Sequence, residues 1–186
     1  MIDENGNNLE LRMYGLVPYN LSPIQQGIQF GHSVVEYSLI NNYIPQYFEW
    51  AKDWKTFIIL NGGTTNNISP ESYGTLNKHL QILFDNDINL SCFEEPDLGD
   101  QLTAITFIVD ERVFNYEKYP DFKDYITQER STFYYNESEK DYYKSGPSKP
   151  FNPKEYFNSF YQEWLILIGG SKNEFLREFL KQFRLA

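Results

Sequence analysis

Two adjoining stretches near the N-terminus decide the fold: Leu11-Arg-Met-Tyr-Gly-Leu-Val-Pro18 and Ser22-Pro-Ile-Gln-Gln-Gly-Ile-Gln-Phe-Gly-His32. The first is short and mainly apolar, which is typical of a strand. The second opens with a hydroxyl residue followed by proline, a pattern that marks the start of a helix. We therefore expect a strand at residues 11–18 and a helix from Ser22 to about Leu39.

A helical wheel separates this helix into an apolar stripe and an adjoining polar ridge. The apolar stripe comprises Ile24, Ile28, Gly31, Val35 and Leu39, and the polar ridge comprises Gln25, Gln29, His32 and Glu36. We expect the stripe to be buried and the ridge to border it. His32 is the residue in the ridge best able to exchange a proton near neutral pH. An ordinary solvated edge, with His32 bonded to Glu36, accounts for the same pattern.

The next elements extend the pattern into an α/β sheet. We expect a short helix at 46–54, a strand at 57–60, a helix from Pro70 to about Asp85, a strand at 88–92 with Ser91 on its solvent side, and a central strand at 102–109. This order predicts a three-layer α/β/α sandwich with a mixed, mostly parallel sheet of about four strands. The core would span residues 1–110.

Two polar segments are candidates for a site: a loop that follows a buried strand end, where such sheets commonly bind ligands, and a turn before the central strand. The loop 61–67, Asn-Gly-Gly-Thr-Thr-Asn-Asn, follows a buried strand and exposes backbone amides. The turn 94–100 holds four carboxylates, which could bind Mg²⁺ or Ca²⁺ or include an acid of raised pKa. Their spacing does not match a calcium loop, so solvated turn acids are favoured and we expect no metal and no cofactor.

Charge is distributed unevenly along the 186 residues, whose net charge is −10. Residues 1–110 hold 4 basic and 14 acidic residues, whereas residues 111–186 hold 12 of each. Because nucleic-acid affinity comes largely from Lys and Arg, an acidic core disfavours such partners. The C-terminal extension, 111–186, holds 9 Tyr and 9 Phe. In it we expect a loop-like section at 129–149 and two closing helices.

Cysteine content and hydropathy bear on the compartment. The one cysteine, Cys92, allows no internal disulfide, and its strand position indicates a buried thiol. No apolar run reaches 18 residues, and the N-terminus has neither the basic start nor the apolar stretch of a signal peptide. We expect a cytoplasmic protein without a membrane partner.

The order of these motifs resembles the class II peptidyl-tRNA hydrolase family, and the whole chain looks most like uncharacterised phage proteins that share this core. The resemblance rests on Met13–Val17, Ser22–His32 and Glu95–Ile105 and covers about residues 11–110. That family has a strand, a helix with Lys-x-x-x-Gln-x-x-His, and an acidic turn leading into an apolar strand. Gln29 and His32 match the helix motif, but Gln25 occupies the lysine position.

Further site residues follow from the resemblance. The active-site carboxylate would be Glu94, Glu95 or Asp97, and the family's threonine would correspond to Gln101 or Thr103. The implied catalytic set is His32, Asp97 and Thr103. The implied ligand-binding set is Gln25, Gln29, Asn61, Gly62, Gly63, Thr64, Glu95 and Gln101. Since a neutral glutamine cannot replace a fixed positive charge, the loss of the lysine weakens the expectation of tRNA hydrolysis.

Three functions remain open. The first is binding, or sequestration, of a small nucleotide-derived ligand in the former active-site pocket. If the protein is encoded by a phage, this ligand would be a signalling nucleotide of the host, bound in the host cytoplasm. The second is hydrolysis of an aminoacyl or peptidyl ester of tRNA, or of a phosphodiester. In it His32 or a turn carboxylate would activate water, and Gln25 or the loop amides of 61–64 would stabilise the oxyanion. The third is capture of a host protein by Tyr134, Tyr135, Tyr142 and Tyr143. A homodimer is compatible with all three.

Overall fold

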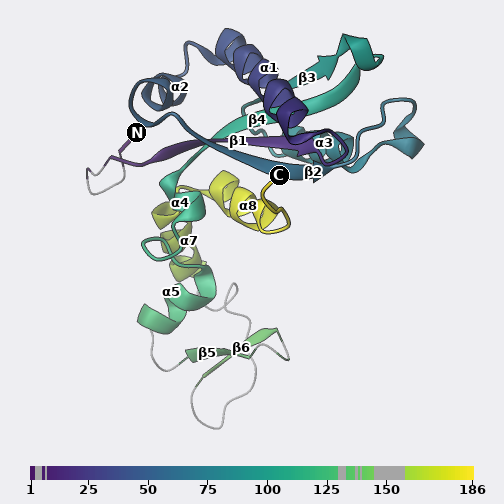
Figure 1. Cartoon of the computed structure of the whole chain (residues 1–186). Helices are drawn as coiled ribbons and strands as arrows, with labels where there is room; N and C mark the ends of the chain where they lie inside the picture. Colours follow the sequence, from purple (N-terminus) through teal and green to yellow (C-terminus); the bar gives the residue numbers. More distant parts are fainter. Residues whose placement is uncertain (3–5, 7, 130–132, 137, 139, 145–157) are drawn as a thin grey trace. The chain divides into compact units, whose positions relative to one another are not determined.

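The computed structural model describes residues 1–2, 6, 8–129, 133–136, 138, 140–144 and 158–186. It divides the chain into two compact units (Figure 1). The first comprises Met1–Glu111 together with Phe175–Ala186, and the second comprises Arg112–Glu174. The end of the chain therefore groups with the N-terminal core, whereas sequence analysis assigned it to the extension.

The first unit is built on a four-stranded mixed sheet with the strand order β2-β1-β4-β3. The strands are β1 (Leu11–Pro18), β2 (Thr56–Gly63), β3 (Leu90–Glu95) and β4 (Gln101–Asp110). β1 and β2 are parallel, while β4 is antiparallel to both of its neighbours, β1 and β3. Three strands thus run in one direction, which confirms the predicted α/β fold with a mixed sheet, although two of the three neighbouring pairs are antiparallel.

Helices cover both faces of this sheet (Figure 1). The helix α1 (Pro23–Asn41) packs on β1, β3 and β4, and α3 (Thr75–Asp85) packs on the other face. A Cβ added at Gly15 would overlap the Phe30 ring of α1, whereas one added at Gly62 would meet Leu76 of α3. The three-layer arrangement therefore depends on a close approach of α1 to the glycine in β1.

The face of α1 that contacts the sheet is opposite to the predicted one. Ile24 and Leu39 of the apolar stripe are 77% and 67% exposed, and Ile28 and Val35 are also exposed. The residues buried against the sheet are Gln26, Gln29, Phe30, Ser33, Tyr37 and Asn41. The prediction of a buried apolar stripe is wrong because Gln26, Gln29 and Ser33 find hydrogen-bond partners in the sheet.

A group of three buried hydroxyls supplies part of this pairing. Ser33 Oγ lies 3.0 Å from Thr106 Oγ1 and 3.3 Å from Ser91 Oγ, and the Ser91 and Thr106 hydroxyls are 2.7 Å apart. Ser91 also donates to the carbonyl of Ser33. Buried polar groups that satisfy one another cost little to bury. For this reason Ser91 faces α1, and the predicted solvent position of Ser91 is also wrong.

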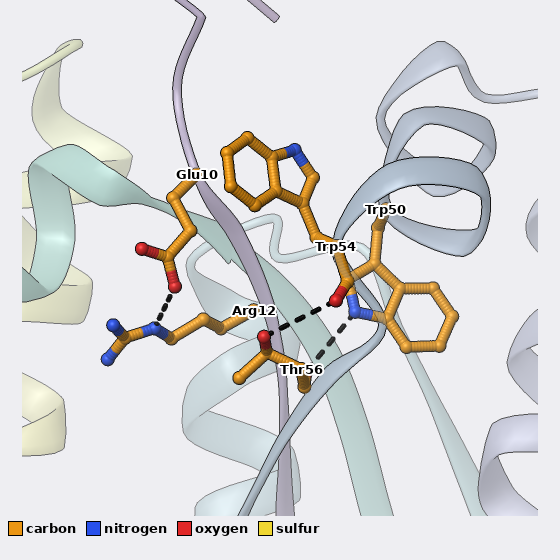
Figure 2. Close-up of polar contacts among 5 residues, drawn as sticks. All are labelled: Glu10, Arg12, Trp50, Trp54 and Thr56. Carbon is orange, nitrogen blue, oxygen red and sulfur yellow. Dashed lines mark hydrogen bonds and ion pairs between the residues drawn. The ribbon is translucent and has the colours of Figure 1, made fainter.

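The end of the sheet where β1 begins is closed by aromatic residues. The helix α2 (Pro45–Glu49) and the π-helical turn η1 (Trp50–Trp54) precede β2, and together they form the helix predicted at 46–54. Trp50 Nε1 donates to the carbonyl of Thr56, and the Thr56 hydroxyl donates to the carbonyl of Trp54 (Figure 2). Arg12 Nε donates to Glu10 at 2.6 Å beside them, which pairs this cation locally.

The C-terminal residues add to the free edge of β2. Leu185 forms an antiparallel bridge with Leu60, the amide of Asn61 donates to the carbonyl of Arg184, and the amide of Ala186 donates to the carbonyl of Ile59. The preceding helix, α8 (Ser171–Leu180), carries Phe179. An edge strand exposes unpaired backbone groups, and these pairings cover part of that edge.

The second unit contains helices and one small hairpin. The helices are α4 (Glu111–Phe114), α5 (Phe122–Glu129) and α7 (Asn158–Leu167). Trp164 packs against Phe122 and donates to the carbonyl of Pro120. β5 (Phe133–Asn136) and β6 (Asp141–Lys144) pair in antiparallel fashion, so part of the section predicted as loop is a hairpin.

Two predictions for the extension concern parts of the chain that the structure does not describe. The start of the first closing helix lies outside the described residues, as do the side chains of Tyr134, Tyr135, Tyr142 and Tyr143. Across the described residues, none of the helices has the length and apolar content needed to cross a membrane.

Candidate functional site

One end of the sheet gathers most of the sequence-predicted site residues. β1, β2 and β3 end there and β4 begins there, because β4 runs against the other three strands. β2 continues to Gly63 and β3 to Glu95, so residues expected in the loop and in the acidic turn are the last residues of strands. A short 3₁₀ turn, η3 (Pro96–Leu98), joins β3 to β4.

A chain of three polar side chains links α1 to this end of the sheet. Gln29 Nε2 donates to Glu95 Oε2 at 2.6 Å, and the Thr103 hydroxyl donates to Gln29 Oε1 at 2.8 Å. Thr103 is fully buried, Gln29 is buried and Glu95 is half-buried. We call these three residues the polar chain. Among the candidate turn carboxylates, Glu95 is the one that contacts Gln29.

A β-bulge explains why Thr103 belongs to this chain. Phe93 pairs with Ala104 and Glu94 pairs with Leu102, so Thr103 is an extra residue in β4. Without the bulge, alternation would direct Thr103 away from α1, because Ala104 packs in the same cluster as Phe30. An extra residue re-aims a side chain in this way, and bulges are common beside active sites. Sequence alternation alone gives no signal for it.

The other implied catalytic residues do not join the polar chain. His32 is exposed, and its ring packs on Phe93 with centroids 4.5 Å apart. Asp97 is exposed in η3. Gln25 closes the capping box of α1, since its Oε1 accepts from the amide and the hydroxyl of Ser22. The residue at the family's lysine position therefore has a structural role at the helix start.

The loop after β2 reaches the turn before β4. The amide of Asn67 donates to Gln101 Oε1 at 3.2 Å, and Asn67 Nδ2 donates to the carbonyl of Asp100 at 2.6 Å. Asn67 Oδ1 accepts in turn from Asn77 of α3. Through these contacts Asn67 fixes the position of the loop at the strand ends.

The loop amides are largely occupied by internal hydrogen bonds. The Asn61 amide donates to Arg184, the Gly63 amide donates to Asn61 Oδ1, and the Thr64 amide donates to Thr75 Oγ1 at 2.8 Å. An oxyanion hole requires donors that point at the reacting oxygen. Amides already engaged in the fold do not meet that requirement, so the loop stabilises the strand end instead.

A cavity of ≈ 300 Å³ lies on the α3 side of this loop. We call it the C-terminal cavity, because it is completed by residues that follow α8. It is lined by Asn61, Gly62, Gly63, Thr75, His79, Gln182, Phe183 and Arg184. Three of these residues were predicted as ligand-binding. The other five were missed, and for Arg184 the available signal was that the extension holds 12 of the 16 Lys and Arg residues of the chain.

The lining combines one cation with neutral polar and aromatic groups. Arg184 is the one formally charged residue of that lining, all of which the structure describes. The His79 ring contacts Phe183 edge-on, with centroids 4.8 Å apart. Burial lowers the pKa of His79, which keeps the imidazole neutral near neutral pH. The cavity thus offers a positive charge beside flat apolar surfaces.

Neither thiol nor metal chemistry is indicated elsewhere in the described part of the chain. Burial, followed by the nearby carboxylates of Glu94 and Glu36, raises the pKa of the Cys92 thiol. A raised thiol pKa disfavours the nucleophilic thiolate. Among the described residues, no group of three or more His, Cys, Asp or Glu side chains is placed to hold a metal ion.

Comparison with protein-family models and with curated proteins finds no match to this chain. The resemblance to class II peptidyl-tRNA hydrolases therefore rests on the residues quoted above.

Proposed function

We propose that the protein binds a small, nucleotide-derived ligand on a peptidyl-tRNA hydrolase-like core. The observation that carries the proposal is the C-terminal cavity, in which Arg184 and Phe183 lie beside Asn61–Gly63 at the ends of the strands. Arginine recognises phosphate oxygens through charged hydrogen bonds, and aromatic rings accept flat bases. A cavity of ≈ 300 Å³ is at the small end of ligand pockets, which suits a mononucleotide.

The distribution of cations supports a small ligand rather than tRNA. The segment 1–110 contains four cations, Arg12, Lys52, Lys55 and Lys78. Arg12 is bonded to Glu10, and Lys55 donates to the carbonyl of Lys52, both beside η1 at the other end of the sheet. A polyanion needs a row of exposed cations along its path. A single phosphate needs one or two, and Arg184 supplies one.

Thermal unfolding with a panel of linear and cyclic mononucleotides and dinucleotides tests the proposal. A ligand present at 100-fold its Kd stabilises the folded state by ~2.7 kcal/mol. For a chain of this size, that corresponds to a rise in Tm of roughly 5–10 °C. Mass spectrometry of small molecules released from the purified protein identifies a ligand carried from the host. Absence of any shift together with an empty pocket would contradict the proposal.

Hydrolysis is a second candidate, and the polar chain is the observation that favours it. Glu95 accepts a hydrogen bond from Gln29 at the end of β3, where a carboxylate could activate water. His32 lies on the same helix as Gln29, one turn further on. The substrate would be an aminoacyl or peptidyl ester of tRNA or a cyclic phosphodiester.

Incubation with charged tRNA and with cyclic nucleotides separates turnover from binding. If the protein is a hydrolase, Glu95→Gln, Asp97→Asn and His32→Ala should identify the acid and base by their losses of kcat. Turnover that is unchanged in all three variants would show that these roles are wrong. Binding without turnover would favour the ligand-binding proposal.

A further inference from the structure

The exposed side of α1 is an apolar surface that none of the described residues of the first unit covers. Ile24, Ile28, Val35 and Leu39 are 77%, 49%, 58% and 67% exposed. They follow one another at spacings of four, seven and four residues, which places them in one stripe. This outward stripe is on the opposite side of the helix from the buried Gln29 and Ser33.

Two glycines border the outward stripe and leave it open to a close approach. A Cβ added at Gly27 or at Gly31 would meet no atom within 4 Å. Glycines spaced four residues apart allow the backbone of another helix to come close. Large aliphatic residues beside these two glycines can pair with the same surface of a second copy, because the isoleucines of one helix can pack over the glycines of the other.

From this geometry we infer that α1 pairs with α1 of a second copy of the chain about a twofold axis. The charge of the surface favours a second copy over a charged partner. Glu36 is the one charged residue among the nineteen of α1, so two copies of the helix can meet without placing like charges in contact. A basic or acidic partner would find no complementary charge on this stripe.

The small area of the apolar surface on α1 limits the affinity of the proposed dimer. A helix of 19 residues is ~28 Å long, and one side of it is smaller than the ~800 Å² that each partner contributes to a standard interface. The exposed apolar residues Tyr43 and Phe48 follow α1 in the chain and can extend the contact. We therefore expect a reversible dimer with a Kd in the micromolar range. The net charge of −10 on each copy opposes association, so added salt should strengthen it.

Sedimentation velocity of the full chain between 1 and 200 µM tests the inference. The wild type should show a concentration-dependent dimer that tightens when NaCl is raised from 50 to 500 mM. Ile28→Asp should weaken association at least tenfold. The matched control is Ile82→Asp, which places the same charge at a comparably exposed isoleucine of α3 and should leave the dimer intact.

Cross-linking locates the contact independently of affinity. In a Cys92→Ser background, Gly31→Cys should form an intermolecular disulfide under mild oxidation, because Gly31 lies near the middle of α1 and would come close to its counterpart in the second copy. Cysteine at Ile82 should not. A wild type that stays monomeric at 200 µM would overturn the inference. This holds whether the surface of α1 is covered by another protein or by another part of the chain. A dimer that survives Ile28→Asp, or that weakens with salt, would overturn it as well.

Discussion

Thr103 and Glu95 are the two sheet residues that hold the side chain of Gln29, and Thr103 is the more deeply buried of the two. Replacing it with valine keeps the shape but leaves Gln29 Oε1 buried without its donor. A buried polar atom without a partner costs about 1–3 kcal/mol, so we expect Thr103→Val to lower the free energy of unfolding by that amount. Urea denaturation measures the change. Thr103→Ser retains the hydroxyl and should cost less, and a valine variant as stable as the wild type would contradict the polar chain.

His79 should make stability depend on pH. Burial lowers its pKa below the ordinary value of ~6.5, so the unfolded chain binds a proton that the folded protein resists. The free energy of unfolding should therefore fall as the pH drops below ~6.5. Urea denaturation between pH 5 and pH 7.5 should show a shallower decline for His79→Gln than for the wild type. Equal slopes would mean that His79 titrates alike in both states.

At the scale of elements, the orientation of α1 is the feature with the largest energetic consequence. Phe30 is 4% exposed and packs on Gly15, whereas Val35 is 58% exposed. Truncating a buried phenylalanine to alanine costs about 3–5 kcal/mol, while an exposed substitution changes stability by about 0.5 kcal/mol or less. We expect Phe30→Ala to destabilise the protein strongly and Val35→Ala to leave it nearly unchanged. If Val35→Ala destabilised the protein more than Phe30→Ala in chemical denaturation, the apolar stripe and not the Phe30 side would be the buried face of α1.

The α/β class and most elements follow from the sequence because turn residues and caps are local signals. Ser22 and Pro23 start α1 as predicted, and the apolar run before Asn61 forms β2. The burial of α1 could not be predicted in this way. Hydrophobic periodicity assumes that polar groups prefer water, yet Ser33 and Ser91 satisfy each other across the interface. Such partners are far apart in sequence, and each looks exposed when considered alone.

The same limit applies to the candidate site. The resemblance to class II peptidyl-tRNA hydrolases implied that Gln29, Glu95 and the 61–67 loop lie at one end of the sheet, and in the structure β2 and β3 end on that side, where Gln29 bonds to Glu95. The bulge at Thr103 and the return of Arg184 to β2 depend on tertiary pairing, so neither could be read from local pattern. The cavity consequently combines residues of the 61–79 segment with residues 182–184, and the sequence identified only Asn61, Gly62 and Gly63 among them.

At the scale of the whole molecule, the proposed ligand site depends on both the acidic core and the C-terminal segment. Residues 1–110 provide the sheet and the loop but hold few cations, and the end of the chain brings Arg184 into the same unit. An anionic ligand would then depend on a residue that lies far from the core in sequence. We therefore propose that Arg184 completes the binding site.

Isothermal titration of the best ligand from the nucleotide panel into the Arg184→Gln variant measures the contribution of Arg184. A charged hydrogen bond contributes about 1.5–3 kcal/mol, so the Kd should rise roughly 10- to 150-fold. Lys181→Gln is the control, because Lys181 pairs with Glu178 and does not line the cavity. We expect the control to bind as the wild type does. An unchanged Kd in Arg184→Gln would contradict the account.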